Sequence, residues 1–175
     1  MACGDDLKTQ LSRYVDGELN AEEKAKVDGH VAECEACRDL LSLFQKNENL
    51  LASALSTDAF GDAVIESVVR KIGRKERIKP ASLEKIAEDG VEPQGEFLGA
   101  VFKQTSTELE ELREKILYIV NALPRIYQQI ILLRHLRKMT YREMSDFLGL
   151  PIATIESRLY RARLMLKEKL MDLYL

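Results

Sequence analysis

Four residues near the start of the chain carry side chains that bind soft metal ions. All three cysteines and one of the two histidines lie within the first 37 residues, in the pattern C-x26-H-x3-C-x2-C, as Cys3, His30, Cys34 and Cys37. Three thiolates and one imidazole make a complete tetrahedral ligand set for Zn²⁺. The spacing therefore predicts a zinc site. The alternative is three unrelated buried thiols and a surface histidine.

This ligand set constrains the helices that carry it. On one continuous helix, His30 and Cys37 would lie about 10 Å apart along the axis. The ligands of one zinc ion lie within about 4 Å of one another. We therefore expect the helix to break near residues 33–35, so that His30 ends one helix and the two cysteines open the next.

Residues 1–57 read as a small helical domain built around this site. Asp16-Gly17 is expected to stop a first helix, and Asn20 with Glu23 forms a capping box for the second. With the four ligands and the stretch from Tyr14 to Leu19, this segment resembles the zinc-binding anti-sigma (ZAS) domain. The resemblance implies a domain that wraps extracytoplasmic-function (ECF) sigma factors and blocks their polymerase contacts. Some members of that family release zinc and form a disulfide on oxidation, and others do not.

An amphipathic helix is expected next, at residues 58–77. Phe60, Val64, Val68 and Ile72 lie on one stripe at helical spacing. A three-helix zinc domain cannot easily bury such a stripe, so it is interpreted as a partner-binding surface. The resemblance implies the same, because a corresponding helix clamps the sigma factor. The alternative is a fourth core helix of the zinc domain.

Residues 78–106 lose this periodicity and contain helix breakers such as Glu92-Pro93, which is typical of a linker. Residues 107–175 then form a four-helix domain, with helices at about 107–122 and 125–137 before the last two. His135, in the second of these, is expected at the surface or in contact with backbone, and not on a metal.

The stretch from Thr140 to Arg163 reads as two short helices joined by a tight turn. Gly149 is suited to the C-cap of the first helix, and Pro151 to the first turn of the second. This is a helix-turn-helix pattern, with polar and basic side chains of the types that read DNA in a major groove. The alternative is a helical hairpin with a solvated basic face. The residues expected to contact DNA are Tyr141, Arg142, Thr154, Ser157, Arg158, Arg161 and Arg163.

The longer stretch from Leu123 to Leu170 resembles region 4 of the ECF group of the sigma-70 family. The motifs that carry this resemblance are Leu123-Pro124, Gly149-Leu150-Pro151 and the run from Ser157 to Arg163. The resemblance implies binding to the −35 promoter element and to the β-flap of RNA polymerase. Glu156 departs from the family pattern, which has Lys or Arg there. A carboxylate repels phosphate but can accept a hydrogen bond from cytosine, so either the DNA sequence read or the affinity should differ.

Composition separates the two ends of the chain. The net charge is −3, but residues 113–175 hold 12 Lys and Arg against 6 Asp and Glu, whereas the rest holds 14 against 23. A basic C-terminal part suits DNA, and an acidic N-terminal part could compete with DNA for it. Sparse Gly and Pro favour an all-α fold. No apolar run is long enough to span a bilayer and no secretory signal is present, so we expect a cytoplasmic protein without a membrane partner.

These observations predict a transcription regulator in which the zinc domain controls the region 4 domain. The amphipathic helix at 58–77 would pack on a region 4 domain, either of the same chain or of a swapped neighbour in a homodimer, and would mask its DNA- or polymerase-binding face. Loss of Zn²⁺ would expose that face. The alternative is an anti-sigma or decoy protein that binds only a sigma factor or RNA polymerase, without reading DNA. A constructed fusion is a third interpretation. An enzyme is not expected, because the protein ligands leave no open position on the zinc.

Overall fold

The computed structural model describes residues 4–55, 62–75 and 108–171, and all regular structure in these ranges is α-helical, as the sequence predicted. The elements are α1 (Asp5–Asp16), α2 (Ala21–Glu33), α3 (Glu35–Ala54), α4 (Asp62–Lys75), α5 (Glu108–Asn121), α6 (Arg125–Leu136), α7 (Tyr141–Leu148) and α8 (Ile152–Met171). The predicted linker at 78–106 lies outside the described residues, as do Cys3 and Phe60.

The first two helices end and begin where the sequence predicted. Gly17 terminates α1 with a left-handed backbone, at φ 71°, which glycine adopts without a Cβ penalty. Asn20 and Glu23 cap α2 reciprocally, since each side chain accepts a hydrogen bond from the other residue's backbone N–H. These helices and the start of α3 enclose a small apolar cluster of Leu11, Val27, Cys37 and Leu41.

The helix-turn-helix pattern is formed by α7 and α8. Thr140 and Glu143 make a capping box at the start of α7, and Gly149 ends it at φ 66°, as predicted. Pro151 lies one residue before α8, where its carbonyl accepts hydrogen bonds from the backbone N–H groups of Thr154 at 2.9 Å and Ile155 at 3.2 Å. Ile155 and Leu159 of α8 are fully buried, whereas Ile152 is 45% exposed.

A second and larger core lies beneath α8. It combines side chains of α5, α6, α7 and α8, among them Ile116, Ile130 and Leu159, all nearly inaccessible to solvent. The C-terminal end of α3 supplies Leu51 to this core, and Leu55 follows directly after the helix. Therefore α3 begins in the small apolar cluster and ends in the large one.

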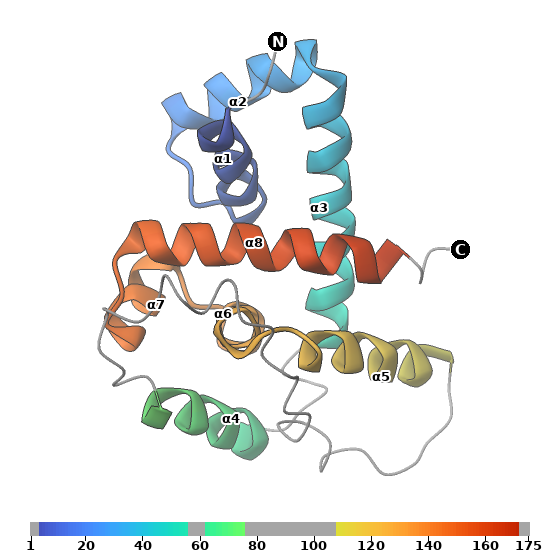
Figure 1. Cartoon of the computed structure of the whole chain (residues 1–175), viewed down its shortest axis with the longest axis vertical. Helices are drawn as coiled ribbons and strands as arrows, with labels where there is room; N and C mark the ends of the chain where they lie inside the picture. Colours follow the sequence, from blue (N-terminus) through green and yellow to red (C-terminus); the bar gives the residue numbers. More distant parts are fainter. Residues whose placement is uncertain (1–3, 56–61, 76–107, 172–175) are drawn as a thin grey trace.

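Helix α4 packs against α6 on the side of the large core away from α8 (Figure 1). Val68 and Ile72 are 4% and 0% exposed, and both belong to the large core. Gly73 allows a close approach, because a Cβ there would lie 3.1 Å from the Phe147 ring of α7. The alternative of a fourth core helix in the zinc domain is therefore wrong.

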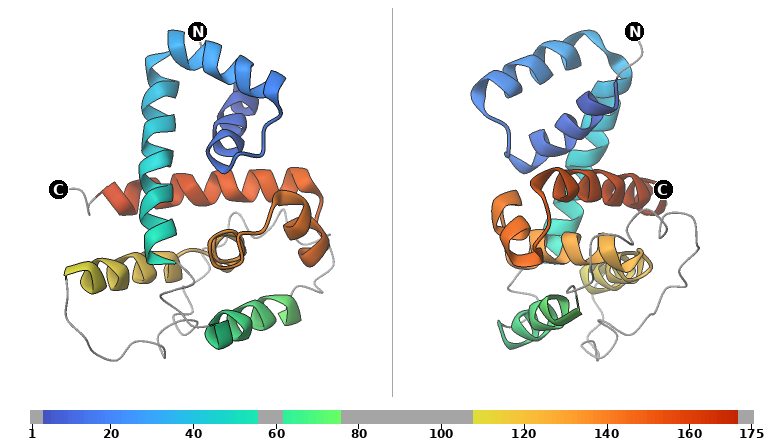
Figure 2. Two further views of the ribbon diagram at one scale, coloured as in Figure 1. Left: turned by 180° about the vertical axis from the view of Figure 1, so that it is seen from behind. Right: turned by 60° about the vertical axis from the view of Figure 1, so that its left-hand side comes forward.

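The helices are arranged around α8, which crosses the middle of the molecule (Figure 1). Helices α1, α2 and the start of α3 lie on one side of it, and α4 to α7 lie on the other, as the two further views also show (Figure 2). In the described ranges, no helix combines the length and the apolar character needed to cross a membrane.

Candidate functional site

The predicted metal ligands come together where α2 ends and α3 begins. The ligand atoms of His30, Cys34 and Cys37 all lie within 4.8 Å of one another. Cys34 is the single extended residue between the helices, at φ −111° and ψ 107°. The helix therefore breaks inside the predicted interval of residues 33–35. Two thiols and one imidazole at this spacing fit three positions of a tetrahedral zinc.

A side chain that the sequence did not single out fixes this break. Arg38 reaches back from α3 and donates hydrogen bonds to two carbonyls at the end of α2, those of Val31 at 3.2 Å and Ala32 at 2.7 Å. The final carbonyls of a helix have no partners within the helix, so this arginine supplies them. The angle between α2 and α3, and hence the position of the ligands, depends on it.

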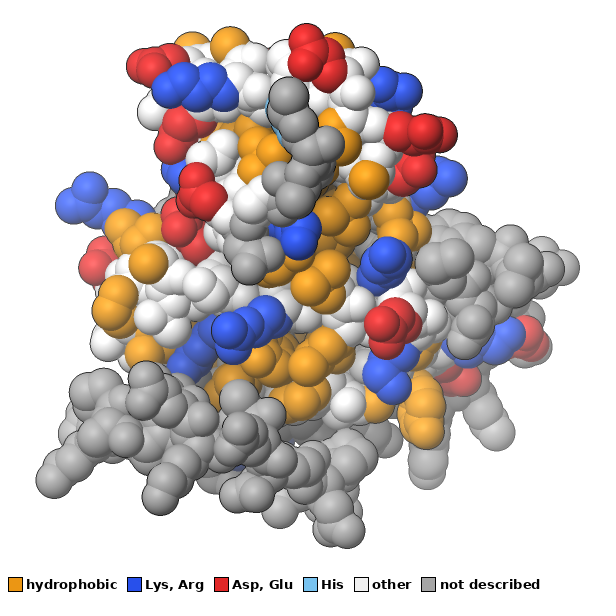
Figure 3. Space-filling view, turned by 45° about the horizontal axis from the view of Figure 1, so that its top comes forward, with side chains coloured by type: hydrophobic (Ala, Val, Ile, Leu, Met, Phe, Trp, Pro, Cys, Tyr) orange, Lys and Arg blue, Asp and Glu red, His pale blue; other side chains and the backbone are white. Residues whose placement is uncertain are grey.

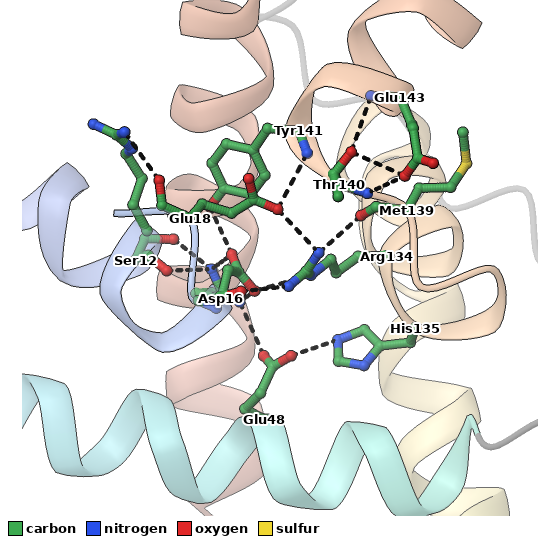
Figure 4. Close-up of polar contacts among 12 residues, drawn as sticks. Ser12, Asp16, Glu18, Glu48, Arg134, His135, Met139, Thr140, Tyr141 and Glu143 are labelled. Carbon is green, nitrogen blue, oxygen red and sulfur yellow. Dashed lines mark hydrogen bonds and ion pairs between the residues drawn. The ribbon is translucent and has the colours of Figure 1, made fainter. Parts of the chain in front are cut away.

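A polar cluster joins the N-terminal helices to the helix-turn-helix (Figure 4). We call it the Asp16 cluster, and it consists of Asp16, Glu18, Glu48, Arg134, Tyr141 and Arg163. The three acids come from α1, the loop after it and α3. The two arginines and the tyrosine come from α6, α7 and α8. In each of these contacts, Asp16 and its partner are at least 118 residues apart in the sequence.

The Asp16 carboxylate accepts hydrogen bonds from three different helices. Arg163 donates to both of its oxygens, at 2.8 and 2.6 Å, in the bidentate geometry that suits arginine and carboxylate. Arg134 Nε donates at 3.1 Å, and the Tyr141 hydroxyl donates at 2.6 Å. The Asp16 side chain is fully buried. Burial alone would raise its pKa, but Arg163 and Arg134 outweigh burial and hold the pKa below its usual value.

Arg163 also contacts Ser12 and Glu48. Besides Asp16, it donates to the Ser12 carbonyl at 3.2 Å, to the Ser12 hydroxyl, and to Glu48 at 3.0 Å. Burial by itself would lower its pKa, but Asp16 and Glu48 raise the pKa above its usual value. The guanidinium is therefore fully charged and is neutralised by acids of α1 and α3.

Arg134 and Glu18 make further contacts around the Asp16 cluster. Arg134 Nη2 donates to the Asp16 carbonyl at 2.7 Å, and its Nη1 donates to the Met139 carbonyl at 2.8 Å. Glu18 lies 3.4 Å from both Arg134 Nη1 and the Tyr141 backbone nitrogen. The start of α7 is thus held directly by the loop after α1.

His135 was predicted at the surface or in contact with backbone, and the surface alternative is wrong. Its ring is 4% exposed, and Nε2 lies 3.5 Å from a Glu48 oxygen. Burial lowers the pKa of His135, and the nearby Glu48 carboxylate opposes that effect only in part. The prediction failed because the partner of this histidine comes from α3, far away in the sequence.

The residues predicted to contact DNA fall into two groups. Arg142, Ser157 and Arg161 are exposed, and Thr154 is half-buried. The other three are buried in this structure and not accessible to DNA: Tyr141, Arg158 and Arg163, at 3%, 7% and 1% exposure.

Glu156, which departs from the family pattern, lies on the side of α8 that faces α1. Its Oε1 is 3.2 Å from Arg13 Nε of α1, an ion pair with both side chains about one-fifth exposed. The predicted partner-binding residues Val64, Val68 and Ile72 belong to or pack against the large core beneath α6. The sequence did not show that Asp16, Glu18, Glu48 and Arg134 join the two ends of the chain. The opposite charges of the two ends were visible in the composition.

Comparisons with known proteins agree with these two regions. Residues 113–166 match the family model described as "Sigma-70, region 4", and residues 3–38 match the one described as "Putative zinc-finger". Curated relatives include the ECF RNA polymerase sigma-E factors of Escherichia coli (strain K12), Salmonella typhimurium (strain LT2) and Shigella flexneri.

Each of these three relatives is 29% identical over 90 residues, which are 49% of this chain and 47% of the relative. The chain thus spans about half the length of the curated relatives it matches. No solved structure gives a significant match. The helix-turn-helix, the cysteine and histidine spacing and both family matches lead to one conclusion: the chain joins a zinc-finger-type domain at its N-terminus to a Sigma-70 region 4 domain.

Proposed function

We propose that this protein is a transcription regulator of the sigma/anti-sigma type, in which the zinc-binding domain masks the region 4 domain of the same chain. The observation that carries the proposal is the buried ion pair between Asp16 of α1 and Arg163 of α8. It ties the N-terminal domain to the helix that would enter DNA.

The packing of α1 on α8 would obstruct the entry of α8 into a major groove. The groove is about 12 Å wide and admits one α-helix, whose diameter with side chains is about 10–12 Å. Here α1 packs on the side of α8 away from α6, and α3 passes alongside α8. DNA binding therefore requires the zinc-binding helices to leave α8, and the Asp16 cluster opposes this movement.

Zinc fits this scheme as the element that holds the N-terminal fold. His30, Cys34 and Cys37 would bind the ion. The bound ion would fix the position of α2 relative to α3, which matters because the apolar cluster of this domain is small. Cys37 is itself part of that cluster. Loss of the ion would loosen α1 and α3, which provide all the acids of the Asp16 cluster except Glu18, and Glu18 follows α1 directly.

The test is DNA binding by the zinc-loaded full chain, compared with the variant Asp16→Asn and with the chelated protein. A labelled duplex pool with a randomised centre serves as probe at fixed salt. Asp39→Asn, an exposed change on α3, is the matched control because it removes the same charge. Masking predicts at least tenfold tighter DNA binding for Asp16→Asn and for the chelated protein, but not for the control. Equal binding by all four would contradict it.

A second function, binding to RNA polymerase without reading DNA, is favoured by the carboxylate of Glu156 on the recognition helix. The same samples decide between the two when core RNA polymerase replaces DNA. Polymerase binding by Asp16→Asn, together with no DNA binding in any state, would support the decoy function over DNA recognition. Circular dichroism of each variant confirms that its helices are retained.

A further inference from the structure

We call the contacts of α1, α3 and the loop after α1 with α6, α7 and α8 the docking interface. Among the ion pairs described there, one has its acid and base on the opposite sides from the others. At Asp16, Glu18 and Glu48 the acids belong to the zinc-binding side and face arginines or histidine. At Arg13 the polarity is opposite, because the base belongs to the zinc-binding side and the acid, Glu156, belongs to α8.

Arg13 is held in place by its own domain. Its Nη1 and Nη2 donate to the two carboxylate oxygens of Glu23 at 3.0 and 3.3 Å, and Nη2 also donates to the Glu18 carbonyl at 3.1 Å. Glu23 is fixed in turn by the Asn20 capping box. The Nε edge is left to face Glu156, so the positive charge meets α8 at a defined place.

We infer that the pair of Arg13 and Glu156 determines which region 4 the zinc-binding domain accepts. The partner it fits is a region 4 with a carboxylate at position 156, as found in this chain or a second copy of it. A region 4 with Lys or Arg at that position would bring two positive charges together. This inference rests on the proposed masking function, whose docking it makes selective.

The pair suits selection better than overall affinity. Both side chains are about one-fifth exposed, and partly exposed ion pairs contribute little to stability. Like charges at the same distance are costly, and repulsion of wrong partners is a common source of specificity. Arg13 cannot swing away from such a charge without leaving Glu23 and the Glu18 carbonyl. Glu156 is thereby a docking residue, and its carboxylate is not needed for contact with a base.

The experiment measures docking itself, by hydrogen exchange of the α1 and α8 amides in the zinc-loaded full chain. Glu156→Lys is expected to speed exchange about tenfold in both helices, because the introduced lysine faces Arg13. Adding Arg13→Gln to this variant should recover most of the protection. Glu156→Gln alone should have only about a two- to threefold effect.

Glu168→Lys is the matched control, since it makes the same charge change at an exposed position farther along α8. Equal exchange in Glu156→Lys and Glu168→Lys would overturn the inference, as would a failure of Arg13→Gln to relieve the first variant. Should Glu156→Lys lose its helical circular dichroism, the coupling between Glu156→Gln and Arg13→Gln gives the same test, and additive effects of the two would overturn the inference.

These outcomes are separate from those for masking. The inference is read from exchange without DNA, whereas masking is read from the DNA affinity of Asp16→Asn. Coupled exchange effects with unchanged DNA affinity would retain the selective docking and reject the masking. Tighter DNA binding by Asp16→Asn with uncoupled exchange effects would reject the selectivity alone.

Discussion

The Asp16 carboxylate holds two arginines and a tyrosine from three helices at once. Although burial opposes ionisation, Arg163 and Arg134 keep the pKa of Asp16 below its usual value. A carboxyl group whose pKa is lower in the folded state stabilises the fold above its unfolded pKa of about 3.9. That contribution is lost as the pH falls through the folded pKa, so the docking interface is fully stabilised by Asp16 at neutral pH.

Replacing Asp16 with Asn is expected to lower the free energy of unfolding by about 3 kcal/mol at pH 7, because the buried arginines lose a charged partner. Urea unfolding of the zinc-loaded protein measures this change. Asp39→Asn, on the exposed part of α3, should differ from wild type by less than about 0.5 kcal/mol. Similar unfolding curves for the two variants would mean that Asp16 is not central to the docking interface.

His135 is expected to make the fold sensitive to mild acid. Its pKa is lowered in the folded state by burial, while Glu48 and Asp16 act to raise the pKa and Arg163 and Arg134 act to lower it. Stability is therefore complete above about pH 6.5, the unfolded value, and declines as the pH falls toward the folded pKa.

The variant His135→Gln removes this titration and leaves the three described metal ligands unchanged. Between pH 6.5 and 5, wild-type stability at saturating zinc should fall more steeply than that of His135→Gln. Thermal unfolding at several pH values measures both slopes. Parallel slopes would show that the acid sensitivity arises elsewhere.

Helix α4 shows how far a single helix can be predicted from its own sequence. The apolar stripe with Val64, Val68 and Ile72 indicated a helix with one buried face, and the described part of that helix, Asp62–Lys75, is as expected. The stripe carried no information about the surface that covers it. That surface is α6 and the Phe147 ring, and it depends on contacts between distant segments.

Ile72→Ala is expected to destabilise the protein by about 3 kcal/mol, because Ile72 is fully buried and its removal leaves a cavity. Arg70→Ala, on the exposed face of the same helix, should have little effect. Denaturant unfolding of both variants distinguishes a packed α4 from one that lies loosely on the surface. In the latter case the two variants would unfold alike.

Local signals were read correctly from the sequence because their physical causes lie within a few residues. The capping box at Asn20, the C-cap at Gly149 and the helix break at Cys34 are of this kind. The burial of Tyr141, Arg158 and Arg163 was not foreseen. A basic residue on a helix looks the same in sequence whether it faces DNA or an acid more than a hundred residues away.

At the scale of the whole molecule, the opposite charges of the two ends meet in the docking interface. The acidic N-terminal part and the basic C-terminal part were evident from composition, and the Asp16 cluster is one place where they pair. The space-filling view, with the N-terminal end tipped forward, shows acidic side chains interspersed with basic ones around the edge of that end (Figure 3). Composition predicted that the ends attract, but not which residues meet.

Zinc removal is expected to lower the melting temperature of the entire protein in a single transition, because α3 belongs to both apolar clusters. Calorimetry with and without a chelator measures this effect, and restored zinc, but not magnesium, should reverse it. Two separate transitions, of which only one responds to zinc, would show that the two ends unfold independently.

The long helix α3 also limits how this protein can be dissected. A cut after residue 57 would leave Leu51 and Leu55 without the core that surrounds them. A fragment starting at residue 107 would expose the core side chains that pack with them. Either fragment would present an apolar surface that the intact chain hides, and such surfaces promote aggregation. If one isolated half failed to bind DNA or zinc, its low solubility would explain the result, and the experiment would not show that this half lacks the function.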